Sequence, residues 1–150
     1  MKYLFGDPKN VDLLRAEVKS WDGTPYWHHD GKKGMGCDCI HFVVRILEVF
    51  GIGPIKVPEY PKDWHLHRNE ELLITGFDKE VPCEPVNCYS PVNGDVLFFK
   101  FGRTLSHAGI YCDGRVWQSL ALNNTGVKEM AYKDPKLYNR LKEARRILYP

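Results

Sequence analysis

Cys39 has the residue type and the position of a catalytic nucleophile. It follows Asp38, a natural helix N-cap, and it precedes a nearly continuous apolar stretch that ends at Gly51. The sequence therefore predicts a buried helix over residues 39–50 with the cysteine in its first turn. The free backbone N–H groups and the helix dipole at that end favour a thiolate, which is the attacking group in cysteine catalysis. Buried, unreactive cysteines are common, so position alone is weak evidence.

His107 and Gln118 are predicted to lie next to each other on one face of a β-hairpin. Asp113-Gly114 is a strong signal for a two-residue hairpin turn. Because side chains alternate between the two faces of a strand, this turn places His107 and Gln118 diagonally on the same face, within side-chain reach. Gly109, which the turn pairs with Gln118, leaves space between the two side chains.

These three residue types together predict attack of a thiol on a carbonyl carbon. The amide oxygen of Gln118 can accept a hydrogen from one imidazole nitrogen of His107, which leaves the other nitrogen for the thiol of Cys39. A neutral side chain would then orient the base, and the base would activate the nucleophile.

The elements that must position these residues follow the order of an α+β domain, with helices first and an antiparallel sheet after them. Apolar residues at helical spacing predict a helix over residues 11–21, and a glycine-rich loop continues to residue 36. The proline-rich segment 52–91 is predicted to be irregular, apart from a short helix near 69–75. The remaining predicted elements are strands over 95–101, 107–112 and 115–120, a helix over 135–143, and an edge strand over 146–149.

Three polar side chains interrupt the predicted buried helix. His41, Arg45 and Glu48 are four and then three residues apart, so they fall on one narrow stripe of the helix. We expect this stripe to be solvated.

The composition is that of one globular domain, assigned to residues 1–150. Hydrophobic residues make up 43% and charged residues 27%, which excludes disorder. A net charge of +2 gives no footprint for a nucleic acid partner. No apolar run is long enough to span a membrane, and the first residues lack a signal-peptide pattern. We therefore expect a protein that is cytoplasmic as synthesised, without structural disulfides.

A structural zinc site is the main alternative from another class. The count of five cysteines is odd, so at least one thiol has no partner within the chain. The cysteine pairs are separated by one and by four residues, which is not the spacing of zinc knuckles. We therefore expect no metal and no other cofactor. The candidate ligands of that alternative are Cys37, Cys39, Cys83, Cys88, His65 and His67.

Four segments of the chain resemble the NlpC/P60 family of cysteine peptidases. The resemblance covers most of the chain, with residues 52–91 outside it, and its most specific parts are the aspartate–cysteine step and the histidine strand with a glycine two residues on. The four segments are 21–26 (WDGTPY), 36–39 (GCDC), 94–99 (GDVLFF) and 106–111 (SHAGIY).

The resemblance implies a papain-like α+β fold in which the cysteine helix packs on the histidine-bearing sheet. It implies a cysteine endopeptidase that hydrolyses amide bonds in peptidoglycan stem peptides, typically between D-glutamate and a diamino acid. Carried over by position, Cys39 is the nucleophile, His107 the general base and acid, and Gln118 the third polar residue.

Further roles are implied for residues near the cysteine. Tyr26 would line the site near the developing oxyanion, and Asp38 and Ser106 match positions that hold the free amino end of the stem peptide. The long insert and the lack of extra binding repeats are similar to phage-tail and prophage members. That likeness implies phage tail proteins as partners, and action in the virion tail or after release on lysis.

The sequence also departs from the family, and other functions stay open. Ile40 and His41 follow the cysteine where the family usually has serine and glycine, which implies a reshaped pocket. The same thiol and imidazole could serve an acyltransferase or a deamidase. A non-catalytic cell-wall-binding module is a further alternative, with an aromatic platform of tryptophans 21, 27, 64 and 117.

Overall fold

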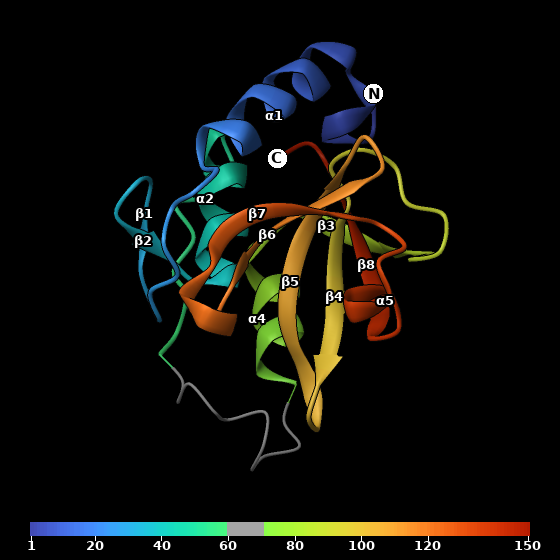
Figure 1. Cartoon of the computed structure of the whole chain (residues 1–150). Coiled ribbons are helices and arrows are strands. Elements are labelled where there is room, and N and C mark those ends of the chain that lie inside the picture. Colours follow the sequence, from blue (N-terminus) through green and yellow to red (C-terminus); the bar gives the residue numbers. More distant parts are fainter. Residues whose placement is uncertain (60–70) are drawn as a thin grey trace.

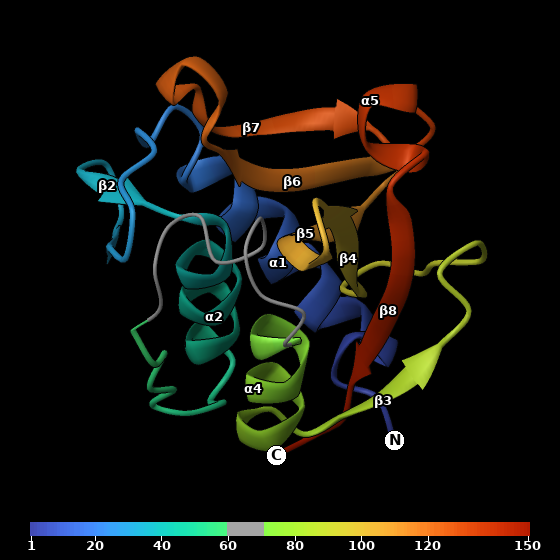
Figure 2. The same ribbon diagram turned by 90° about the horizontal axis from the view of Figure 1, so that it is seen from below.

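The protein is built around a six-stranded antiparallel sheet with helices on both faces (Figures 1 and 2). The computed structural model describes residues 1–59 and 71–150. Predictions for the other residues, including His65, His67 and Trp64, lie outside the described residues. The strand order is β3-β8-β4-β5-β6-β7. The strands are β3 (Cys83–Val86), β4 (Val96–Phe101), β5 (Thr104–Cys112), β6 (Arg115–Leu120), β7 (Gly126–Ala131) and β8 (Leu141–Ile147). This is the predicted α+β class.

Helices α2 (Cys39–Val49) and α4 (Leu72–Glu80) stand side by side against one face of the sheet (Figure 2). On that face α2 contacts β5 and β6, and α4 contacts β5. The short helix α5 (Pro135–Tyr138) packs on the opposite face through Leu137. The smaller elements are η1 (Leu4–Gly6), α1 (Pro8–Ser20), η2 (Leu122–Asn124), and a two-stranded ribbon of β1 (Gly31–Lys32) and β2 (Gly36–Cys37).

Strand β4 is buried on both faces, which explains its continuous apolar run. Phe98 belongs to the core that contains Phe42 of α2. Leu97 and Phe99 belong to the second core, with Leu137. A strand covered on both sides needs apolar side chains at every position.

The hairpin has the predicted turn and register. In β5 and β6, Ile110 pairs with Trp117 and Cys112 with Arg115, on either side of the turn. Asp113 and Gly114 both have positive φ, 52° and 77°, as the favoured hairpin turn requires.

The solvated stripe predicted for α2 is wrong at its first position. His41 is only 6% exposed, because its ring nitrogen Nδ1 lies 2.8 Å from an oxygen of the buried Asp38. Arg45 and Glu48 are half-buried and form an ion pair of 2.9 Å.

The prediction of a helix over 135–143 followed by an edge strand over 146–149 is wrong, because strand β8 already begins at Leu141. Leu141, Ala144 and Ile147 recur every third residue, which imitates helical spacing. The chain instead leaves α5 after Tyr138, and β8 inserts between β3 and β4 rather than closing the edge. Two neighbouring strands satisfy its backbone groups, and the nearly buried Arg145 pairs with Asp78 at 2.8 Å.

Other boundaries also differ from the prediction. Strands β3 and β7 were not predicted; β3 contains Pro85, which an edge strand tolerates. Helix α1 starts at Pro8 rather than at residue 11, because Asp7 caps it by accepting a hydrogen bond from Lys9 N. Helix α4 extends to Glu80, beyond the predicted 69–75.

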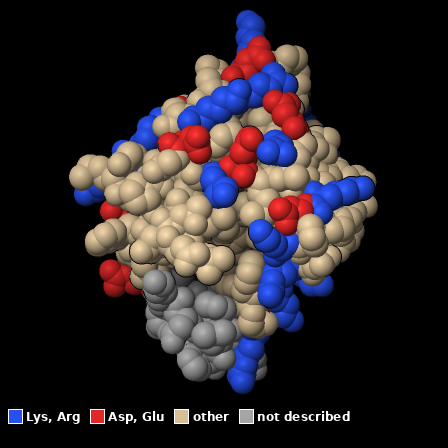
Figure 3. Space-filling view, viewed as in Figure 1, with Lys and Arg blue, Asp and Glu red and all other residues tan. Residues whose placement is uncertain are grey.

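On the face shown in Figure 3, basic side chains predominate at the lower right. Basic and acidic side chains are interspersed over the region of α1, and a broad area left of centre carries neither. None of the helices in the described residues combines the length and apolar character needed to cross a membrane.

Candidate active site

The Cys39 thiol lies at the first turn of α2, against the strand that carries His107. Asp38 caps the helix, its carboxylate accepting a hydrogen bond from His41 N at 2.9 Å. The Cys39 Sγ approaches the carbonyl oxygen of Ser106 at 3.9 Å, and the backbone of Ala108 also interacts with the sulfur. The thiol therefore lies beside the two backbone groups that flank His107.

The thiol is protonated in the resting site. Burial, followed by the negative charge of Asp38, raises the pKa of Cys39 to about 12. Backbone N–H groups of Ala108, Ile40 and Cys39 itself lower the pKa, as expected for a helix start, but their effect is smaller. The predicted preference for a thiolate is therefore outweighed by desolvation.

His107 and Gln118 form the predicted pair. The imidazole Nε2 lies 2.7 Å from the Gln118 Oε1, and Gln118 is fully buried. An oxygen acceptor at this distance fixes the hydrogen on Nε2 and leaves Nδ1 as the basic nitrogen. The rings of Phe99 and Phe101 lie 5.6 and 5.8 Å from the imidazole, centre to centre, and hold its orientation.

The His107 imidazole is held in its neutral form. Burial lowers the pKa of His107, and the hydrogen bond that the imidazole donates to Gln118 offsets this only in part. A neutral imidazole with a free nitrogen is a general base rather than a resting cation.

Two backbone features allow the pair to form. A Cβ on Gly109 would lie 2.7 Å from Val116 Cγ1 and 3.3 Å from Gln118 Cβ, so only glycine fits there. The register of β4 against β5 shifts where Phe99 pairs with His107 and Lys100 with Leu105, which leaves Ser106 as a bulge. Bulges next to active sites re-aim side chains.

Tyr26 supplies a protonated phenol near the thiol. Burial, followed by the electrostatic effects of the neighbouring Cys39 and Asp38, raises the pKa of Tyr26. Its backbone bridges to Cys37, whose carbonyl accepts a hydrogen bond of 2.7 Å from the Ser119 hydroxyl. The segment before the nucleophile is thus tied to β6, and the phenol keeps the hydrogen that an oxyanion needs.

The sequence of the chain was compared with models of known protein families. The model of the NlpC/P60 family matches residues 23–146. This chain belongs to the NlpC/P60 family.

Individual relatives of this NlpC/P60 chain are distant. The murein DD-endopeptidase MepS/murein LD-carboxypeptidase of Escherichia coli K12 is 26% identical over 144 residues, covering 93% of this chain and 66% of that protein. An NLP/P60 lipoprotein-like structure from Staphylococcus aureus gives a TM-score of 0.67 at 17% identity, over 96% of this chain and 43% of that one. The peptidoglycan hydrolase RipB of Mycobacterium tuberculosis gives 0.61 at 14% identity, over 95% and 66%. These structures support the predicted fold.

Asp38 and Ser106, the implied amine-holding residues, make internal contacts in this NlpC/P60 chain. The Asp38 carboxylate is 2% exposed and accepts hydrogen bonds from His29 N at 2.7 Å and His41 N at 2.9 Å. The Ser106 hydroxyl donates to the Phe101 carbonyl at 3.2 Å. Their role toward a substrate stays a prediction.

Sequence reasoning missed His29, and it missed the contact of His41 with Asp38. The rings of His29 and His41 lie 5.0 Å apart, centre to centre. The spacing of Asp38 and His41, three residues apart across a helix start, is a signal that could have indicated their contact. No local pattern indicates His29, because the loop path alone brings it to the helix.

The residues of the alternative zinc site and of the alternative aromatic platform are dispersed in the described part of the chain. Cys37 lies in the core beside α2, whereas Cys88 lies in the core on the other face of the sheet. Cys83 contacts Asp78. Of the tryptophans proposed as a platform, Trp21 and Trp117 are buried, and Trp27 is exposed.

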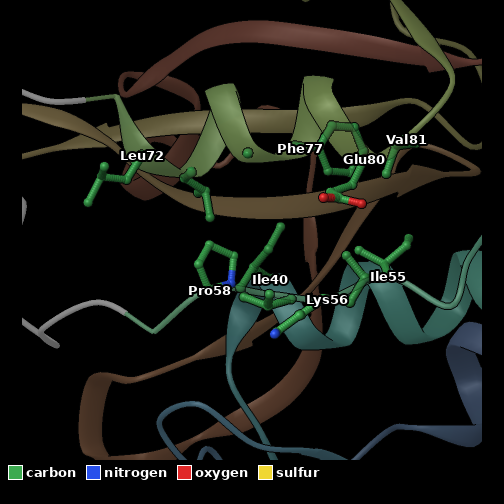
Figure 4. Close-up of a pocket in the computed structure, with 12 residues that line it drawn as sticks. Ile40, Ile55, Lys56, Pro58, Leu72, Phe77, Glu80 and Val81 are labelled. Carbon is green, nitrogen blue, oxygen red and sulfur yellow. The ribbon is translucent and has the colours of Figure 1, made fainter.

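An apolar gap lies between α2 and α4 (Figure 4), and its lining does not include Cys39, His107 or Gln118. Ile40 and Ile55 face Leu72 and Phe77 across it. Its interior volume of about 30 Å³ has room for one or two water molecules.

Proposed function

We propose that this NlpC/P60 protein is a cysteine endopeptidase that hydrolyses amide bonds in peptidoglycan stem peptides, between D-glutamate and a diamino acid. The observation that carries the proposal is the partly buried hydrogen bond between His107 of β5 and Gln118 of β6, since the Cys39 thiol packs against β5 beside His107. The printed functions of the E. coli and M. tuberculosis relatives, a murein peptidase and a peptidoglycan hydrolase, support this substrate class. Action in a phage tail or after lysis stays a prediction.

The first step joins attack and proton transfer. Because the thiol and the imidazole are both neutral at rest, His107 Nδ1 takes the Sγ proton as the sulfur of Cys39 attacks the carbonyl carbon. The carbonyl π electrons move to oxygen, where the Tyr26 phenol donates a hydrogen bond. Gln118 holds the imidazolium through its Nε2–H.

The remaining steps restore the enzyme. The imidazolium gives its proton to the leaving amine as the C–N bond breaks, which leaves a thioester on Cys39. Water then loses a proton to His107 and attacks the thioester, and the thiol leaves with that proton.

The deciding experiment is digestion of purified stem peptides, with products identified by mass spectrometry. Cys39→Ala should lower turnover by at least about a thousandfold, whereas Cys83→Ala, which changes a cysteine of the edge strand β3, should retain it. Reaction in ¹⁸O-water should label the new carboxylate, which distinguishes hydrolysis from acyl transfer to an amine. Full turnover by Cys39→Ala, or peptide binding without any product from the parent protein, would reject the proposal.

A further inference from the structure

The second cluster of polar side chains near α2 is formed by His29, Asp38 and His41. Each residue offers one ligand atom, and these atoms lie within 4.8 Å of one another. Around a tetrahedral ion with bonds of about 2.1 Å, neighbouring ligand atoms lie roughly 3.4 Å apart. Side-chain rotations that move the ligand atoms at most about 1.4 Å closer together therefore close the cluster around one ion.

One nitrogen in this cluster has no hydrogen-bond partner among residues 1–59 and 71–150. His29 Nδ1 is buried and makes no hydrogen bond within the described residues. The other nitrogen of the same ring, Nε2, lies 3.9 Å from a carboxylate oxygen of Glu59. The buried Nδ1 is therefore the nitrogen of His29 that is open to a ligand, and Glu59 lies beyond hydrogen-bond distance of the other.

The cluster is also held in place by the backbone. His29 adopts a positive φ of 57°, a strained conformation for a residue with a side chain. The Asp38 carboxylate supports it by accepting a 2.7 Å hydrogen bond from His29 N, and the same carboxylate caps α2 through His41 N. The loop and the helix start are thus joined at Asp38, so the three side chains are organised before any ion binds.

We propose that His29, Asp38 and His41 form a binding site for one divalent transition-metal ion of the Zn²⁺ type. Two imidazoles and one carboxylate suit Zn²⁺ and its close relatives, with water completing the coordination. The ion takes the place of the hydrogen between His41 Nδ1 and Asp38 Oδ1, which are 2.8 Å apart, and the neutral imidazole then carries its hydrogen on Nε2 instead. Since Asp38 directly precedes Cys39, occupancy changes the charge beside the thiol from negative to positive.

The test uses the full chain carrying Cys39→Ala, so that the nucleophile cannot bind the ion itself. The protein is stripped with a chelator, exchanged into metal-free buffer, and titrated with Co²⁺ and then with Zn²⁺. We expect one equivalent of Co²⁺, visible absorption of a low-symmetry site, no thiolate charge-transfer band, and displacement by Zn²⁺.

Variants locate the ion within the chain. His29→Gln and His41→Gln should each weaken Zn²⁺ binding at least about tenfold, whereas His28→Gln, a matched change at the adjacent histidine, should leave the affinity unchanged. Circular dichroism reports whether each variant is folded. His29 lies in a loop, so its variant decides the question if His41→Gln fails to fold.

X-ray absorption of the Zn²⁺-loaded protein tests the site with the three ligands unmutated. Only nitrogen and oxygen ligands, two of them imidazole, are expected. Each of three results would overturn the proposal. The protein does not bind the ion stoichiometrically, the bound ion has sulfur ligands, or His29→Gln binds Zn²⁺ with the affinity of the parent protein. None of these readouts depends on peptide turnover, so the metal site and the peptidase function fail independently.

Discussion

Two histidines with an oxygen partner lie near the Cys39 thiol, and their partners differ in charge. His107 contacts the neutral amide of Gln118 at 2.7 Å. His41 contacts the carboxylate of Asp38 at 2.8 Å. Both contacts are hydrogen-bond length, so the partner's chemistry rather than the distance separates the two.

In the proposed mechanism, this difference gives His107 and His41 different tasks. A neutral partner orients the imidazole without stabilising its cation strongly, so the lowered pKa of His107 keeps a free base ready for the thiol proton. A carboxylate partner places a negative charge beside Cys39, which raises the pKa of the thiol. The His107–Gln118 pair therefore suits proton transfer, and the His41–Asp38 pair suits helix capping and cation binding.

Of the substitutions that test this comparison, removal of the His107 imidazole should lower turnover the most. His107→Gln should lower turnover of stem peptides by about a hundred- to ten-thousandfold, the usual contribution of a positioned general base. His41→Gln should lose less than His107→Gln, because His41 does not receive the thiol proton. Equal losses in two folded variants, measured by peptide cleavage in the presence of chelator, would contradict the assignment of tasks.

Gln118→Glu gives His107 a carboxylate partner, as His41 already has in Asp38. A carboxylate beside His107 should raise the pKa of the imidazole, and the acid limb of the pH–rate profile for kcat/KM should move to higher pH. Turnover at pH 7 should fall about ten- to a hundredfold, because less of the base is then free. Gln118→Asn is the matched neutral control, and its pH limb should stay where it is in the parent.

Asp38→Asn removes the charge but keeps a residue that caps helices well. Since the Asp38 charge is one cause of the raised Cys39 pKa, the pKa of the thiol should fall by about one unit. Alkylation by iodoacetamide at pH 8 in chelator should then be roughly tenfold faster, with burial still keeping the pKa above the ordinary value of 9.0. An unchanged alkylation rate would show that this charge does not act on the thiol.

The smallest expected effect is on stability in acid. Because burial lowers the pKa of His107 below 6.5, the unfolded chain binds a proton more readily than the folded one as the pH falls through that value. His107 therefore favours the folded state above pH 6.5 and loses that contribution below it. Urea unfolding at pH 7 and pH 5 should show a larger loss for the parent protein than for His107→Gln.

Local patterns in the sequence determined the parts of the site that depend on near neighbours along the chain. Asp38 before an apolar run predicts the capped helix start that holds Cys39. Asp113-Gly114 predicts the register that brings His107 to Gln118, because a two-residue turn leaves little freedom in strand pairing. Both interactions link residues at most eleven positions apart.

Only the tertiary structure decided what depends on burial and on distant segments. The sequence shows a thiol at a helix start, but packing against β5 removes water from it, and desolvation outweighs the helix dipole. The spacing of Leu141, Ala144 and Ile147 favours a helix, yet pairing with β3 and β4 makes a strand. His29 reaches Asp38, only nine residues further on, through the path of an irregular loop, and such a path leaves no periodic trace in the sequence.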